Sequence, residues 1–268
     1  MASRYSAMFQ RLRAQGEGAF GAFVMLGDPD LETSAAILDE LVAGGADMIE
    51  VGFPFSDPVA DGPVIQAAAV RALAAGARPR DCFALIRGFR ARHPDVPAGI
   101  LTYANPVLAR GRDAFYRAAR EAGADSVLVA DVPAMEAAPF VAAARAWGVA
   151  PVLIAAANTP PDRLRRIARL GAGFTYCVAR SGVTGAGDEV RLDHRQMLAI
   201  LRDASAPPPV FGFGISRPGH VRAALDAGAA GAISGSAIVD LVARGQPMRG
   251  FVEAMKAATR SLCTAGTG

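Results

Sequence analysis

The sequence predicts an α/β fold, namely a single-domain (β/α)8 TIM barrel over residues 1–268 with an extra helix at its N-terminus. The chain has 268 residues and 52% of them are hydrophobic, which is enough to fill one large core. A helix end rich in Ala and Gly, followed by a short apolar run, recurs along the chain, as in residues 121–130 and 226–235. The apolar runs number about eight, which is the strand count of such a barrel.

The predicted elements follow one another in a regular order. Residues 1–15 predict an amphipathic helix, because four large apolar side chains recur at helical spacing: Tyr5, Met8, Phe9 and Leu12. Runs that are apolar on both faces, as parallel strands are, lie near residues 20–26, 47–52, 97–103, 125–130, 150–155, 173–178, 209–213 and 230–234. Helical segments between them include residues 32–43, 111–122 and 216–227. Residues 264–268 are expected to form a frayed tail.

A doubly wound parallel sheet is the alternative arrangement of the same elements. No G-x-G-x-x-G motif follows the first predicted strand, which argues against a dinucleotide-binding fold of that kind. No linker or low-complexity segment divides the chain. In a barrel the active site lies at the C-terminal ends of the strands, so catalytic residues are expected there.

Composition argues against several classes of function. The net charge is +3 without a basic block, so nucleic-acid binding is not expected. No apolar run approaches the ~18–20 residues that span a bilayer, and the N-terminus lacks the apolar core of a signal peptide. The three cysteines are an odd number at wide spacing, which fits neither a disulfide framework nor a zinc motif. We therefore expect a cytoplasmic protein that binds neither membranes nor nucleic acids.

Three acids in residues 49–68 are candidates for chemistry. Strand alternation places Glu50 on the inner face near the strand's C-terminal end, where it is either catalytic or a structural glutamate paired with a buried group. Asp61 precedes a helical run and could be only its N-cap. Asp57 precedes a proline in a loop, where a turn or surface role is expected.

Two glycine-rich turns follow the last two predicted strands, at residues 211–216 and 233–237. Many barrels hold phosphate at this place through backbone amides and a helix N-terminus, so phosphate binding is favoured over simple tight turns. A third glycine-rich loop, residues 180–187, suits either a mobile lid or a plain surface loop. Strand alternation also brings aromatic residues to the barrel mouth, which suggests a ligand with a flat apolar group and a phosphate: Phe23, Tyr103, Tyr176 and Phe213.

Missing residue types narrow the chemistry further. Lys256 is the sole lysine and lies in the last predicted helix, which we expect to be far from any strand end, so Schiff-base catalysis is excluded. The three histidines have no metal-ligand spacing, so no metal site is expected. General acid–base catalysis by carboxylates remains, worth about 10²–10⁴ in rate per group.

Six segments, in order along nearly the whole chain, resemble the tryptophan synthase alpha subunit family. The most specific is GFPFSDPVADGP at residues 52–63, which is closely similar to that family's signature. The others are residues 18–30, 125–133, 180–186, 212–216 and 228–239. The resemblance implies a (β/α)8 lyase that cleaves indole-3-glycerol phosphate to indole and glyceraldehyde 3-phosphate by a retro-aldol step, within tryptophan biosynthesis.

The resemblance also implies a role for each matching position. Glu50 and Asp61 would be catalytic, with Glu50 moving protons and Asp61 holding the indole N–H. Thr184 would close over the substrate, next to Asp61. The indole pocket would be lined by Phe23, Leu101, Tyr103, Leu128, Ala130, Ile154, Tyr176, Phe213 and Ile233. Phosphate would be bound by Gly185, Gly214, Gly235 and Ser236.

The family resemblance implies a partner as well. Its members pair with a pyridoxal-phosphate-dependent beta subunit as an αββα heterotetramer, so the cofactor would belong to the partner and none to this chain. The interface would include Asp57 and the segment around Asn105-Pro106. The chain departs from the usual family pattern at Met25, at Phe53 and at residues 155–157, none of which is a catalytic or phosphate position.

Other functions fit the same residues. A different phosphate-handling barrel, such as a sugar-phosphate epimerase or isomerase, is one, although the lack of metal-ligand histidines argues against the epimerase. A non-catalytic barrel that activates a partner is another, and the presence of both Glu50 and Asp61 argues against it. A stand-alone indole-releasing lyase would carry the same residues.

Overall fold

The computed structural model describes residues 3–178 and 194–260. Its eight parallel strands hydrogen-bond in sequence order and form a closed barrel, because β8 pairs with β1. The strands are β1 (Ala19–Met25), β2 (Met48–Gly52), β3 (Ala98–Thr102), β4 (Ser126–Val129), β5 (Ala150–Ala156), β6 (Thr175–Val178), β7 (Pro209–Gly212) and β8 (Gly231–Ser234). The predicted barrel is confirmed, and the open doubly wound sheet is wrong.

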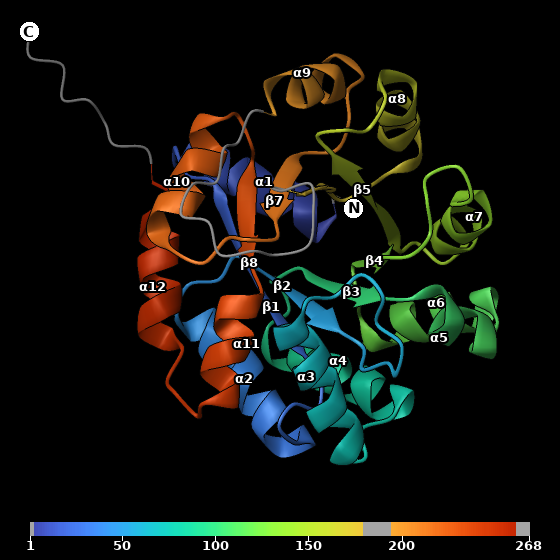
Figure 1. Ribbon diagram of the computed structural model, residues 1–268, viewed down its shortest axis with the longest axis vertical. Helices are drawn as coiled ribbons and strands as arrows, with labels where there is room; N and C mark the ends of the chain where they lie inside the picture. The colour runs from blue at the N-terminus through green and yellow to red at the C-terminus, as the bar shows by residue number, and fades with distance from the viewer. Residues whose placement is uncertain (1–2, 179–193, 261–268) are drawn as a thin grey trace, which may run out of the picture.

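Helices surround the strands on the outside of the barrel (Figure 1). They are α1 (Arg4–Ala14), α2 (Leu31–Ala43), α3 (Pro63–Ala74), α4 (Pro79–Arg92), α5 (Ala104–Arg110), α6 (Arg112–Ala122), α7 (Ala138–Ala146), α8 (Pro161–Leu170), α9 (Arg195–Asp203), α10 (Pro218–Asp226), α11 (Ser236–Ala243) and α12 (Arg249–Ala257). The extra N-terminal helix is confirmed as α1, and the three helical segments predicted above are α2, α6 and α10. None of the helices in the described part of the chain has both the length and the apolar character needed to cross a membrane.

Strand alternation divides the buried side chains into an inner and an outer layer. Here the inner face of a strand is the side that faces the barrel interior. Met48 belongs to the inner cluster, whereas Ile49 and Val51 pack with the surrounding helices. Glu50, two residues after Met48, therefore lies on the inner face, as the alternation predicts. Register brings Glu50 beside Phe23 of β1 and Gly99 of β3.

The N-terminal helix closes the barrel at the end opposite the expected active site. Tyr5 of α1 belongs to the inner cluster, and its hydroxyl lies 2.9 Å from the Ser126 hydroxyl at the start of β4. Its ring centroid lies 5.4 Å from that of Phe174, just before β6. The described helix therefore covers the N-terminal ends of the strands and does not cover their C-terminal ends, where the active site is expected.

Lys256 takes part in an ion-pair network at the N-terminal end of the barrel. Its Nζ atom lies 2.8 Å from a carboxylate oxygen of Glu17 and 2.8 Å from one of Asp47. These two acids immediately precede the N-terminal parts of β1 and β2. The expectation that Lys256 lies far from any strand end is thus wrong, because α12 packs against the strand N-termini. Lys256 is remote only from the C-terminal ends of the strands.

Candidate active site

Glu50 is a buried acid at the centre of the barrel. Its side chain is 4% exposed, and within the described residues its Oε2 atom has no hydrogen-bond partner. Burial raises the pKa of Glu50 to about 8, and the negative charge of Asp61 adds to this effect. The carboxyl group therefore holds its proton at neutral pH, which suits a general acid. The structural alternative, a glutamate paired with a buried cation or amide, has no support among the described contacts.

Asp61 reaches the same space from the loop after β2. The N-cap of α3 is Gly62, and no side chain caps this helix, so the N-cap role considered for Asp61 is wrong. Burial raises the pKa of Asp61, while a hydrogen bond from the Tyr103 hydroxyl opposes the rise. The negative charge of Asp61 in turn contributes to the raised pKa of Glu50, so the two carboxyl groups interact electrostatically at this end of the barrel.

Tyr103 holds the Asp61 loop against the end of β3. The backbone N–H of Ala60 donates a hydrogen bond to the Tyr103 hydroxyl, with 3.2 Å between nitrogen and oxygen. That hydroxyl in turn donates to the Asp61 carboxylate. The ring stacks at a tilt against Phe55, with centroids 5.5 Å apart. The sequence suggested only that Tyr103 lines a pocket, and its link to Asp61 is a role that sequence reasoning missed.

The residues predicted to line the indole pocket come together on the inner face. Five of them are buried members of the inner cluster: Phe23, Leu101, Leu128, Tyr176 and Ile233. Ala130 and Ile154 pack against that cluster and are partly buried. These side chains form an apolar wall at the level of Glu50, which accounts for the lack of a hydrogen-bond partner for its Oε2 atom among the described residues.

Phe213 extends the apolar wall to the surface. It is 39% exposed, and its ring meets that of Tyr176 edge-on with centroids 6.0 Å apart. Its φ of 61° lies in the left-handed region, which is strained for an aromatic residue. A Cβ on the preceding residue, Gly212, would lie 2.0 Å from the Tyr176 hydroxyl oxygen, so only glycine fits there. The Tyr176 side chain thus packs against the end of β7 at the edge of the site.

The two glycine-rich turns after β7 and β8 lie side by side. The Ser234 hydroxyl donates to the backbone carbonyl of Ile215, with 2.7 Å between the oxygens. Gly214 has a φ of 78°, and no atom lies within 4 Å of where its Cβ would be. Gly235 is the N-cap of α11 and Ser236 its first residue, and a Cβ on Gly235 would lie 3.5 Å from the Phe23 ring. The turn that begins α11 therefore directly adjoins the apolar wall.

Two of the residues predicted for substrate binding, Thr184 and Gly185, lie outside the described residues, as does the whole of the third glycine-rich loop at 180–187. In the described part of the chain, no group of three or more His, Cys, Asp or Glu side chains could hold a metal ion. What the described site offers is one acid that keeps its proton, a second acid beside it, an apolar wall and two turns suited to phosphate.

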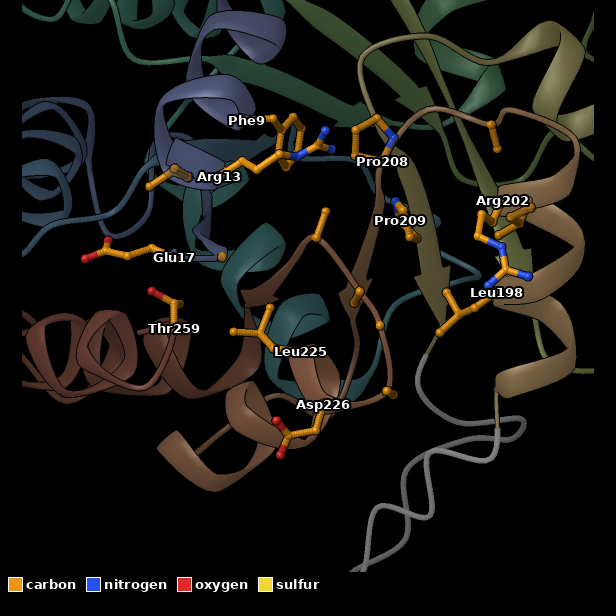
Figure 2. A pocket seen from close by; sticks show the side chains of 18 of the residues that line it. Phe9, Arg13, Glu17, Leu198, Arg202, Pro208, Pro209, Leu225, Asp226 and Thr259 are labelled. Atoms are coloured by element: carbon orange, nitrogen blue, oxygen red, sulfur yellow. The ribbon is translucent and has the colours of Figure 1, made fainter. Parts of the chain in front are cut away.

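A separate pocket of about 880 Å³ lies at the other end of the barrel (Figure 2). Its lining includes residues 207–209, at the start of β7, residues 227–230, which precede β8, and side chains of α1, α9 and α10. Figure 2 shows Phe9 and Arg13 on one side of it and Leu198 and Arg202 on the other. None of the described residues predicted for catalysis or substrate binding lines this pocket. The acid pair, rather than this pocket, therefore remains the candidate active site.

Comparison with known proteins shows the family to which the chain is similar. The family model described as tryptophan synthase alpha chain matches residues 9–265. A tryptophan synthase alpha chain from Shewanella amazonensis is 54% identical over 265 residues, which cover 96% of this chain and 100% of the relative. One from Escherichia coli is 50% identical over 266 residues, covering 96% and 99%. The solved structure of Mycobacterium tuberculosis tryptophan synthase superposes with a TM-score of 0.88 at 32% identity, covering 97% of this chain and 99% of that one.

Proposed function

Since the chain belongs to the tryptophan synthase alpha chain family and is a lyase of tryptophan biosynthesis, we propose that Glu50 and Asp61 perform its chemistry. The reaction is the retro-aldol cleavage of indole-3-glycerol phosphate to indole and glyceraldehyde 3-phosphate. The observation that supports this assignment best is the burial of the Glu50 carboxyl group, which raises its pKa to about 8 together with the negative charge of Asp61.

Glu50 acts as the proton donor and acceptor. In its protonated form it transfers a proton to the indole carbon that bears the glycerol side chain. The resulting carboxylate then takes the proton of the adjacent glycerol hydroxyl as that oxygen becomes the aldehyde carbonyl. The carbon–carbon bond breaks, its electron pair returns to the indole ring, and Glu50 is protonated again. A pKa near neutrality suits a group that must both give and take a proton.

Asp61 stabilises the positive charge that develops on the indole ring. Protonation of the ring carbon leaves a cationic iminium nitrogen, and an ionised carboxylate beside the N–H lowers its energy. The hydrogen bond from Tyr103 favours this ionised form and opposes the effect of burial. The two acids therefore have separate tasks, which their different surroundings support.

The remaining predicted residues hold the substrate. The indole ring packs against the apolar wall on the inner face, beside Phe23 and Tyr176. The phosphate binds the paired turns at Gly214, Gly235 and Ser236, together with Gly185, and Thr184 closes over the substrate. A Cβ on Gly235 would lie 3.5 Å from the Phe23 ring, and this closeness supports a substrate whose phosphate and aromatic ring lie a short distance apart.

The proposed catalytic role is tested by the turnover of indole-3-glycerol phosphate in three variants. Glu50→Gln keeps the size of the side chain and removes its acid–base function, so we expect a loss of at least about 10³-fold. Asp61→Asn should also be strongly impaired. Glu121→Gln is the matched control, because Glu121 is an exposed residue of α6 outside the site. Near-normal turnover in Glu50→Gln would overturn the assignment.

We also propose that the chain assembles with a beta subunit as an αββα heterotetramer, through the face around Asp57 and Asn105-Pro106. Large apolar side chains are exposed on this face, from loops and helices that follow β2, β3 and β4: Val59, Leu108 and Met135. A pocket of about 500 Å³ opens beside them, with Phe55, Asn105 and Pro106 in its lining. Exposed apolar groups at one face are a signature of an interface.

Pyridoxal phosphate belongs, in this proposal, to the beta subunit. The sole lysine of the chain, Lys256, is committed to ion pairs at the opposite end of the barrel and is not placed to hold an aldehyde cofactor. We further propose a cytoplasmic location, in keeping with the buried free thiols of Cys82 and Cys177.

Size-exclusion chromatography with a beta subunit tests the assembly. Wild type should co-elute with it, and Leu108→Asp should not, because a charge would be buried at the interface. Val70→Asp is the matched control, since Val70 is an exposed apolar residue on α3. If wild type elutes alone, the chain is a stand-alone lyase and the partner proposal fails.

A further inference from the structure

We propose that Met25 is a positioning residue of the active site, whose thioether keeps hydrogen-bond donors and water away from the Glu50 carboxyl group and so keeps that group in its proton-donating form. The proposal rests on the catalytic role proposed for Glu50. It concerns a residue that touches neither the reacting atoms nor the phosphate turns and acts only through its neighbour.

Met25 lies on the inner face at the C-terminal end of β1. It is 4% exposed and belongs to the inner cluster together with Phe23. Register pairs Phe23 with Glu50 and Met25 with Gly52, so the two β1 side chains lie alongside β2 at the level of the acid and one step above it. Met25 is therefore on the side of Glu50 from which solvent would enter the barrel.

The absence of a side chain at Gly52 lets Met25 cover the end of β2. Gly52 follows Glu50 on the same face of the strand, two residues nearer the mouth. A Cβ at Gly52 would lie 3.0 Å from both the sulfur and the terminal methyl of Met25, and 2.7 Å from the Cζ atom of Phe23. The thioether and the ring tip thus occupy the space directly above Glu50 that a larger residue would fill.

Apart from Met25 and Phe23, few side chains surround Glu50, and each can be named. The titratable groups that interact electrostatically with Glu50 are Asp61 in the loop after β2, Tyr176 of β6 and Tyr5 of α1. The neighbouring strands contribute no titratable side chain beside it, since β1 presents Phe23 and Met25, and β3 presents Gly99 and Leu101. No described group donates a hydrogen bond to its Oε2 atom.

This arrangement makes Met25 a position where one polar atom would change the ionisation of Glu50. Gln has nearly the size and length of Met but ends in an amide that donates hydrogen bonds. A donor held at the position of the Met25 terminal methyl would favour the ionised carboxylate and admit water to it. Leu fills the same region without any polar atom, so it preserves the apolar cover.

The test compares Met25→Gln with Met25→Leu by two readouts. The first is the titration of the Glu50 side-chain carboxyl carbon in ¹³C-labelled protein without substrate, with the resonance assigned by its loss in Glu50→Gln. The second is the dependence of kcat/KM on pH for indole-3-glycerol phosphate. Circular dichroism checks that each variant is folded. Met25→Ser, which admits water by leaving a gap, replaces Met25→Gln if the latter does not fold.

We expect Met25→Gln to move the Glu50 titration midpoint down by about one pH unit and Met25→Leu to leave it in place. The alkaline limb of kcat/KM should move with it, so that Met25→Gln loses about threefold in rate near pH 7.5 and recovers near pH 6. An unmoved midpoint in the polar variant, or an equal shift in both variants, would overturn the proposal. If the midpoint moves but the rate profile does not, Met25 controls Glu50 as stated and the catalytic assignment of Glu50 fails.

Discussion

Replacing Glu50 by glutamine should remove the loss of stability that wild type undergoes between pH 4.5 and 8, while it abolishes turnover. The reason is the raised pKa of Glu50, which is about 8 in the folded protein against an ordinary value of 4.5. Below pH 4.5 the acid is protonated in both the folded and the unfolded chain, and its contribution to stability is fully present. As pH rises toward 8, the unfolded chain releases the proton and the folded chain keeps it, so wild type loses stability. Above about 8 both forms are ionised and the loss is complete.

The size of the effect follows from the same two values. Each pH unit between them costs about 1.4 kcal/mol, so the interval from 4.5 to 7 corresponds to about 3 kcal/mol. Glutamine carries no charge at any pH and escapes this loss. Relative to their values at pH 4.5, the free energies of unfolding of Glu50→Gln and wild type should therefore diverge by about 3 kcal/mol at pH 7.

Urea unfolding at several pH values between 5 and 8.5 measures this divergence. Fluorescence of Trp147, the sole tryptophan, and far-UV circular dichroism provide two probes, and their coincidence tests whether the transition is two-state. Glu121→Gln should follow wild type at every pH, since its side chain is exposed. Parallel pH profiles for Glu50→Gln and wild type would refute the reasoning, because they would mean that Glu50 titrates alike in the folded and unfolded chain.

Three further substitutions probe the surroundings of the acids. Tyr103→Phe removes the hydrogen bond that lowers the pKa of Asp61, so we expect at least about a tenfold loss in kcat. The rate is measured over a range of substrate concentrations, so that kcat is separated from KM. Gly212→Ala places a Cβ against the Tyr176 hydroxyl and should cost about 1–3 kcal/mol in urea unfolding, whereas unchanged stability would show that Tyr176 moves freely. Phe213→Gly removes the ring that meets Tyr176 at the edge of the apolar wall and should raise KM for indole-3-glycerol phosphate, whereas an unchanged KM would contradict the proposed place of Phe213 in the substrate pocket.

Local sequence periodicity was sufficient to predict the barrel and the face on which Glu50 lies. Strand alternation depends only on neighbouring residues, so Met48 and Glu50 could be assigned to the inner face before any pairing was known. The glycine-rich turns could likewise be located, because their order along the chain fixes which strands they follow. These are properties of short segments.

Contacts between segments that are distant in sequence could not be predicted in the same way. The bonds of Tyr103 to Ala60 and Asp61 join the end of β3 to a loop more than 40 residues earlier, and they depend on strand register. The packing of Met25 on Gly52 likewise depends on the pairing of β1 with β2. The position of Lys256 depends on how α12 returns to the strand N-termini, which no local pattern contains.

The pH dependence of kcat/KM for indole-3-glycerol phosphate tests the central claim most directly, since it reports the ionisation of the free enzyme's essential groups. If Glu50 must be protonated to begin the reaction, kcat/KM should fall above a midpoint near pH 8, where that carboxyl group ionises. A profile that stays flat to pH 9.5 would contradict the account, because turnover would then continue with Glu50 ionised.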